Sequence, residues 1–150
     1  MRVGVLADTH GLLRPRVLDL LAGADRILHA GDVGTTEVLA RLGDIAPVEA
    51  VRGNIDGGPE TGALPAFLQG ELEGLPFQMV HRREDADLKS LKRLRLVVFG
   101  HSHRPELEWR GACLLLNPGA CGPRRFSLPL TLAILTIADG RLVPEILSVE

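Results

Sequence analysis

The stretch that decides the fold is Leu96-Val97-Val98-Phe99-Gly100-His101-Ser102-His103. Four apolar residues bounded by glycine are typical of a buried strand, which places the two histidines at the strand's C-terminal end. Neutral imidazoles one residue apart at such a position are a usable pair of transition-metal ligands. An isolated pair is equally consistent with two surface histidines in a turn, so the interpretation depends on partners elsewhere in the chain.

Three further strand patterns in the N-terminal half each end in a polar, glycine-marked loop. Val3–Ala7 leads into Asp8-Thr9-His10-Gly11, Ile27–Ala30 into Gly31-Asp32, and Val48–Val51 into Arg52-Gly53-Asn54-Ile55-Asp56. The two intervening segments have apolar residues on one face and are typical of helices. This alternation predicts a parallel βαβαβ core, whose loops gather at the carboxyl ends of the strands, where open α/β sheets bind ligands.

The C-terminal half predicts a second sheet. Phe67–Leu72 and Phe77–His81 indicate a hairpin through Glu73-Gly74, and residues 84–93, acidic at the start and basic at the end, predict a helix. Two more strand pairs are expected: Glu106–Arg110 with Cys113–Leu116, and Leu130–Ile137 with Leu142–Leu147. No linker or repeat interrupts the chain, so we predict a single domain, residues 1–150, of the α/β class with two sheets in contact.

Composition excludes several classes of function. The chain has 150 residues, 45% of them hydrophobic, which suffices for a substantial core. A net charge of -2 and an aromatic content of 3% argue against nucleic-acid binding. No apolar run is long enough to span a membrane. The two cysteines, Cys113 and Cys121, lack C-x-x-C spacing and no signal-peptide pattern precedes the first strand, so we expect a cytoplasmic protein with reduced thiols.

Seven potential metal ligands follow the predicted strands. They are Asp8, His10, Asp32, Asn54, His81, His101 and His103. Nitrogen and oxygen donors without a thiolate suit divalent manganese, iron, zinc, nickel or cobalt. Seven donors exceed the need of one tetrahedral ion. If one carboxylate bridges, they divide into two sites, as in two-metal hydrolases.

The order D-x-H, G-D, G-N-x-D, a lone histidine and G-H-x-H resembles that of the calcineurin-like metallophosphoesterases. The resemblance extends from Asp8 to about Arg125 and is closest to the small bacterial and archaeal phosphodiesterases with G-N-x-D. It implies a four-layer α/β/β/α sandwich of two packed mixed sheets flanked by helices. It also implies a phosphodiesterase with two divalent ions, manganese first among the candidates, acting on a small phosphate ester.

The resemblance also implies a division of the ligands. Asp8, His10 and His103 would bind one ion, Asn54, His81 and His101 the other, and Asp32 would bridge them. A hydroxide between the ions would be the nucleophile. A phosphomonoesterase or nucleotide phosphatase remains an alternative, as does a protein-binding module like the retromer scaffold subunit, which shares the fold. All seven ligand positions are filled, which favours a catalytic function over protein binding. Polar groups are costly to bury, and binding a protein partner gives no reason to collect so many of them at strand ends.

Two departures from the family pattern bear on substrate choice. Ile55 stands where the larger family has a histidine that protonates the leaving group, so we expect acidic leaving groups, or protonation by metal-bound water or Asp56. Asp56 is expected to orient a ligand or tie down its loop rather than to transfer a proton. His29 is expected to be buried and hydrogen-bonded. The sequence leaves open whether Arg82 and Arg83, or Arg124 and Arg125, contact phosphate, and whether the protein forms a homo-oligomer.

Overall fold

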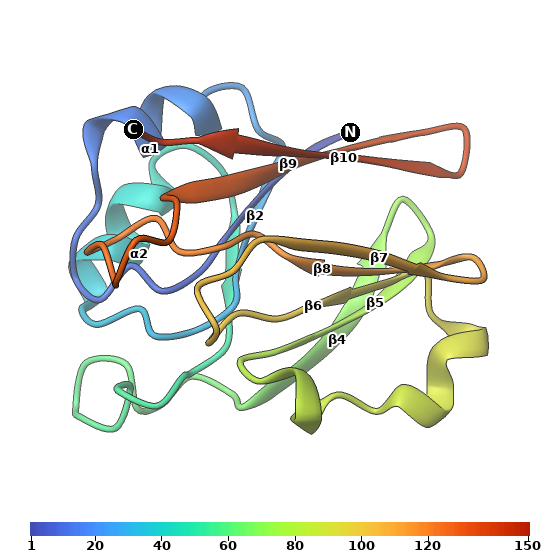
Figure 1. Ribbon diagram of the computed structural model, residues 1–150, viewed down its shortest axis with the longest axis horizontal. Coiled ribbons are helices and arrows are strands. Elements are labelled where there is room, and N and C mark those ends of the chain that lie inside the picture. The colour runs from blue at the N-terminus through green and yellow to red at the C-terminus, as the bar shows by residue number, and fades with distance from the viewer.

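Two five-stranded sheets pack face to face at the centre of the protein in the computed structural model, which describes residues 1–150 (Figure 1). The first has the order β10-β9-β1-β2-β3 and consists of β1 (Arg2–Leu6), β2 (Arg26–His29), β3 (Val48–Ala50), β9 (Thr131–Ala138) and β10 (Arg141–Ser148). The second has the order β4-β5-β6-β8-β7 and consists of β4 (Phe67–Leu72), β5 (Leu75–Val80), β6 (Leu96–Val98), β7 (Glu106–Arg110) and β8 (Cys113–Asn117).

Both sheets are mixed, with three parallel strands in each. Strands β1, β2 and β3 are parallel and are connected through α1 (Pro15–Leu21) and α2 (Thr36–Gly43), which confirms the predicted βαβαβ core. Strands β5, β6 and β8 are parallel in the second sheet, and antiparallel neighbours complete each sheet. Parallel strands end at the same edge of a sheet, so the polar loops after β1, β2 and β3 collect there.

Alternation of side chains along the strands produces the layers. In β1, Val3 and Val5 belong to the cluster between the two sheets, whereas Leu6 packs with α1 and α2. In β6, Val98 faces the first sheet and Val97 faces the opposite side. Strands covered on both faces need apolar residues at successive positions, which explains the unbroken apolar runs in the sequence. The predicted sandwich of packed mixed sheets with outer layers is confirmed.

The outer cover of the second sheet differs from the predicted helix. Residues 84–93 form two 3₁₀ segments, η1 (Arg83–Asp85) and η2 (Leu88–Arg93), which lie across the sheets from the two α-helices in Figure 1 (yellow-green). Ala86 between them is extended, and Asp87 binds back to the chain: its carboxylate accepts from the Lys89 amide at 3.2 Å and from the Ser90 hydroxyl at 2.7 Å. Such local side-chain bonds compete with a continuous helix.

Other features agree with the sequence predictions. Glu73 and Gly74 form the β4–β5 turn with φ of 51° and 78°, as a tight hairpin turn requires. Cys113 and Cys121 are buried and unpaired. No helix of the structure has both the length and the apolar character needed to cross a membrane.

Candidate metal centre

Three loops converge at one edge of the first sheet. The loop after β1 runs beside the loop after β2, because the amides of Asp8 and His10 donate to the carbonyls of Gly31 and Asp32, each at 2.9 Å. The loop after β6 joins them: the His101 amide donates to Asp8 Oδ2 at 3.1 Å. The bond from the His101 amide to the Asp8 carboxylate thus joins residues that are 93 positions apart in sequence.

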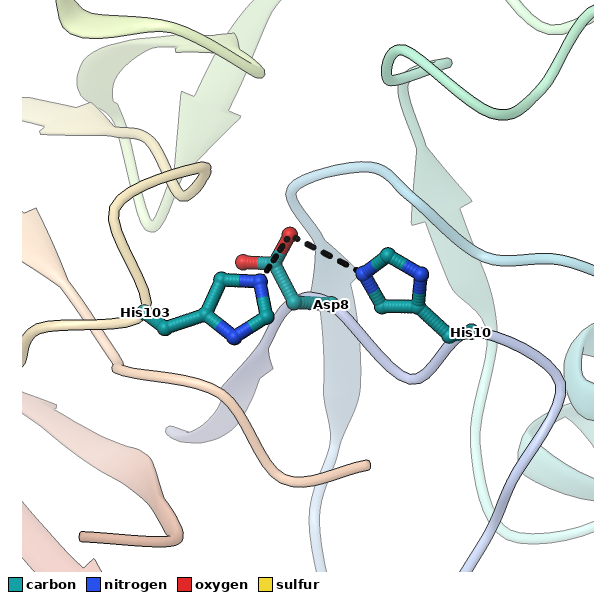
Figure 2. Close-up of side chains that lie close together, drawn as sticks. All are labelled: Asp8, His10 and His103. Atoms are coloured by element: carbon teal, nitrogen blue, oxygen red, sulfur yellow. Dashed lines mark ion pairs between the residues drawn. The ribbon is translucent and has the colours of Figure 1, made fainter. Parts of the chain in front are cut away.

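Asp8 occupies the centre of this cluster. Its Oδ1 atom lies 3.5 Å from His103 Nε2, 3.8 Å from His81 Nε2 and 3.9 Å from His10 Nε2. Figure 2 shows His10 and His103 approaching the carboxylate from opposite sides, with their rings pointing toward it. The Asp8 side chain is fully buried, so the carboxylate faces its neighbours rather than solvent.

Asp32 lies between two of the same histidines. Its Oδ2 atom is 3.5 Å from His10 Nε2 and 3.4 Å from His81 Nε2. Its other oxygen, Oδ1, accepts a hydrogen bond from the Ile55 amide at 3.1 Å. The carboxylate is therefore anchored through one oxygen and presents the other to both imidazoles.

The remaining sequence candidates lie at the exposed side of the cluster. His101 is solvent-exposed, and its ring centroid is 5.3 Å from that of His81. His10 and His103 form a second ring pair, with centroids 5.6 Å apart. Asn54 is exposed and lines, together with His81, a cavity of about 190 Å³. The histidines thus form the same two pairs, His10 with His103 and His81 with His101, that the family resemblance implied.

The backbone of the cluster is strained. Eight non-glycine residues have positive φ, and five of them are candidate ligands: Asp8, His10, Asp32, His101 and His103, with φ from 47° to 72°. Side chains with a Cβ disfavour this region, and such strain persists where the surroundings impose it, typically at functional sites. The concentration of strain here sets this loop cluster apart from the rest of the molecule.

Two motif glycines are required by close approach. A Cβ on Gly31 would lie 2.6 Å from His81 Nδ1, and Gly31 has φ of 101°. A Cβ on Gly53 would clash with the Asp32 carboxylate and with the Asp32 amide nitrogen. The glycines of G-D and G-N therefore let the histidine and the carboxylate reach their places.

Asp56 ties the loops after β2 and β3 together. Its Oδ2 atom accepts from the amides of Gly53 at 2.8 Å and Val33 at 3.1 Å, and its Oδ1 atom from the Gly34 amide at 3.0 Å and the Thr61 hydroxyl at 2.8 Å. Burial acts to raise its pKa, but these hydrogen bonds together hold the pKa below the usual range. Both oxygens are occupied, which agrees with loop anchoring and disfavours proton donation.

Two buried side chains outside the ligand set, His29 and Asn117, make hydrogen bonds that hold the loops of the cluster in place. His29 is fully buried; its Nδ1 accepts from the Gly31 amide at 3.1 Å, and its Nε2 is 3.0 Å from the Thr9 hydroxyl. Asn117 donates through Nδ2 to the Gly100 carbonyl at 3.0 Å and to the Ser102 hydroxyl at 3.1 Å. Asn117 thereby clamps the loop that carries His101 and His103. No role was predicted for Asn117 from the sequence, although its place at the end of the apolar β8 run was a signal.

The charges of the cluster are unevenly distributed. Burial raises the pKa of Asp8 to about 7, partly opposed by His81. Burial also acts to raise the pKa of Asp32, but the neighbouring His81 ring and the hydrogen bond from the Ile55 amide hold it at about 2. For His103, burial and then the Arg125 charge lower the pKa to about 4. For His81, burial acts to lower the pKa, but Asp32 and the Ala30 carbonyl raise it above the usual value. The neutral imidazole that metal ligands need is thus favoured at His103, whereas His81 keeps its proton more readily.

The donor atoms fit divalent ions. Asp8 Oδ1, His10 Nε2 and His81 Nε2 are buried without a hydrogen-bond partner, although buried polar atoms are normally paired. Two groups have donor atoms within 4.8 Å of one another: Asp8, His10 and His103, and Asp8, Asp32 and His81. Ligand bonds of about 2.0–2.2 Å separate two donors of one ion by roughly 3–3.6 Å, close to the shorter contacts observed here. Asp8 belongs to both groups, whereas the family resemblance implied that it binds only one of the two ions.

The fold and this cluster define the protein as an α/β protein with a candidate metal centre, and comparisons with known proteins define its class further. The sequence profile of the calcineurin-like phosphoesterase superfamily domain matches residues 1–140. A probable metallophosphoesterase of Methanothermobacter thermautotrophicus is 32% identical, over 98% of this chain and 92% of the relative.

Two solved structures show the same fold. An archaeal phosphodiesterase superposes with a TM-score of 0.81 at 23% identity, covering 98% of this chain and all of its own. Zinc-bound Vps29 of Entamoeba histolytica superposes with a TM-score of 0.75 at 22% identity, covering 100% of both chains. The chain belongs to the calcineurin-like phosphoesterase superfamily, as the motif order indicated, and it is a metal-dependent phosphoester hydrolase.

Proposed function

We propose that this protein is a two-metal phosphodiesterase. The observation that carries the proposal is the position of Asp32, whose Oδ2 atom lies within 3.5 Å of both His10 Nε2 and His81 Nε2. One oxygen facing an imidazole from each histidine pair is suited to bridge two ions. A single ion would be bound by only one of the two histidine pairs and would leave the other pair without a metal to bind.

The ligands divide between the two ions as follows. His10 and His103 bind one ion with Asp8, and His81, His101 and Asn54 bind the other, with Asp32 shared. The ring pairs His10–His103 and His81–His101 support this division. Because Asp8 Oδ1 is also 3.8 Å from His81 Nε2, Asp8 is near enough to influence the second ion. Manganese is our first choice of metal, as the family resemblance implied, and a donor set of nitrogen and oxygen without a thiolate accommodates it.

When bound, two divalent ions lower the pKa of a water molecule between them and neutralise phosphoryl oxygens. The protein's own contribution is positional. His81 donates through Nδ1 to the Ala30 carbonyl at 2.7 Å, which leaves its Nε2 lone pair directed at Asp32. The Asp56 hydrogen bonds fix the loop that carries Asn54. Rigid donors reduce the reorganisation that the reaction requires.

Leaving-group chemistry points to activated or acidic esters. The Ile55 side chain is 48% exposed beside Asn54 and has no proton to give. Asp56 accepts hydrogen bonds through both oxygens, so it does not replace the missing acid. The protein therefore favours leaving groups that depart without protonation, such as the phenolate of an aryl phosphodiester.

The test combines metal analysis with a substrate panel. Protein loaded with manganese is expected to hold two ions per chain by elemental analysis and to hydrolyse bis(4-nitrophenyl) phosphate faster than 4-nitrophenyl phosphate. A higher rate on the monoester would favour the phosphatase alternative. Two bound ions with no turnover of either ester would favour the alternative of a protein-binding module. Binding of only one ion would contradict the proposed mechanism.

A further inference from the structure

Arg82 and Arg83 follow the candidate ligand His81 at the end of β5, and the structure separates their roles. Arg83 donates to Glu106 at 3.3 Å and to Glu108 at 2.9 Å, and its guanidinium lies 5.7 Å from the centre of the Phe99 ring. These contacts fix the Arg83 side chain against β7 and β6. Its charge is thereby engaged within the fold.

Arg82 has no such partners. Its side chain takes part in none of the ion pairs or side-chain hydrogen bonds of the molecule and is exposed. It lines the cavity of about 190 Å³ that also contains His81 and Asn54. An unpaired guanidinium in a cavity beside candidate metal ligands is available to a bound anion.

The rest of the cavity wall supports an anionic occupant. Arg52 contributes a second guanidinium, which is held in place because it donates to the Leu64 carbonyl at 3.1 Å. Asp85 is the one acidic residue in the lining, so the lining side chains carry a net positive charge with His81 neutral. Ala66 is the only hydrophobic lining residue, and no phenylalanine, tyrosine or tryptophan lines the cavity to stack on a base or an aryl group.

We propose that this cavity is a subsite for a second anionic group of the substrate, a phosphate or a carboxylate, contacted by Arg82 and Arg52. The inference rests on the proposed hydrolysis at the adjacent metal centre and names the substrate class: a phosphoester whose non-leaving arm carries a second negative charge. Because His81 and Arg82 are adjacent in sequence, the end of β5 provides both a ligand for the metal ion and a contact for this second negative charge.

The test compares two 4-nitrophenyl phosphodiesters that share the leaving group and differ only at the end of the second arm, which is 2-phosphoethyl in one and 2-methoxyethyl in the other. For the manganese-loaded protein, kcat/KM is expected to be about tenfold higher for the phosphoethyl ester, the effect of one charge-assisted hydrogen-bond pair. Arg82→Gln should lower the ratio of the two kcat/KM values, and Arg82→Gln combined with Arg52→Gln should bring it to about one. Arg83→Gln is the matched control, because it removes a neighbouring charge of the same kind and should keep the ratio. Asp85→Asn should raise the ratio, because it removes the one negative charge from the cavity lining.

The outcomes separate this proposal from the proposed function. Equal kcat/KM values for the two esters in the unmodified protein, or an unchanged ratio in Arg82→Gln, would overturn the subsite while leaving the hydrolase intact. If neither ester is hydrolysed, the proposed function fails and binding decides the subsite alone. Titration calorimetry would then compare propane-1,3-bisphosphonate with propylphosphonate. Tighter binding of the bisphosphonate that Arg82→Gln and Arg52→Gln together abolish supports the subsite, and equal affinities overturn it.

Discussion

The Nδ1 atom of His81 lies 2.7 Å from the carbonyl oxygen of Ala30, at the end of the neighbouring sheet's β2 strand. A carbonyl only accepts, so Nδ1 carries the proton and Nε2 presents its lone pair to Asp32 and Asp8. This one hydrogen bond joins the two sheets at the site and fixes the ligand tautomer. It explains how a lone histidine, without a local motif around it, takes a defined place in the cluster.

Replacing Asp32 with alanine should remove both ions. The carboxylate faces His10 and His81 together, so its loss deprives each half of the site of its shared oxygen. We expect elemental analysis to find less than one ion per chain, and diesterase activity to fall by roughly 100-fold or more, since even outer partners of metal ligands typically account for 10–100-fold. Asp19→Ala, on the exposed face of α1, is the matched control. Retention of two ions in Asp32→Ala would contradict the bridging role.

Replacing His103 with alanine should weaken the binding of one metal ion more than the binding of the other. His103 contacts Asp8 and pairs with His10, but it lies outside the His81–His101 pair. We expect one ion per chain to remain and the affinity of the other to be lost. The reciprocal variant, His81→Ala, should retain the ion held by His10 and His103. If both ions leave in His103→Ala, the proposed division of ligands is wrong.

Asn117 offers a test of positioning rather than ligation. Asn117→Ala removes the clamp on the Gly100 carbonyl and the Ser102 hydroxyl, so the histidine loop loses its fixed conformation. We expect metal affinity to fall about 10–100-fold with the fold retained. Circular dichroism checks the fold, and titration of the apoprotein with Mn²⁺ measures the affinity. Unchanged affinity would show that backbone bonds alone hold the loop.

Much of this site was predictable because the chain marks strand ends locally. Apolar runs that end in polar, glycine-marked loops located Asp8, Asp32 and His101. Parallel pairing of β1 and β2 then predicted that the loops of Asp8 and Asp32 meet. The clamp made by Asn117 was missed because it depends on a contact 17 residues away in sequence. The helix predicted for residues 84–93 failed because Asp87 bonds locally to Lys89 and Ser90, which charge order along a segment does not reveal.

His29 should make the ion-free protein sensitive to acid. Burial lowers its pKa to about 4, below the roughly 6.5 of an unfolded histidine. Since the folded-state pKa is the lower one, its stabilising effect is complete above about pH 6.5 and is lost as the pH falls toward 4, by up to about 3 kcal/mol. Urea unfolding in the presence of a chelator should therefore show a smaller loss between pH 7 and pH 4.5 in His29→Gln, despite its lower stability at pH 7. Parallel pH curves would rule out the buried neutral imidazole as the cause.

Ile55 should determine which leaving groups the enzyme tolerates. Its amide donates to Asp32 Oδ1, so the backbone is fixed, while the exposed side chain is free to be exchanged. Because isoleucine donates no proton, kcat on an aryl diester should exceed kcat on an alkyl diester by several orders of magnitude. Ile55→His should narrow this gap by about 10²–10⁴-fold, the usual contribution of a positioned general acid, with a new dependence of kcat on pH. Ile55→Val keeps the side chain apolar and should retain the gap. Comparable rates on both esters in the unmodified protein would mean that another group already protonates the leaving oxygen.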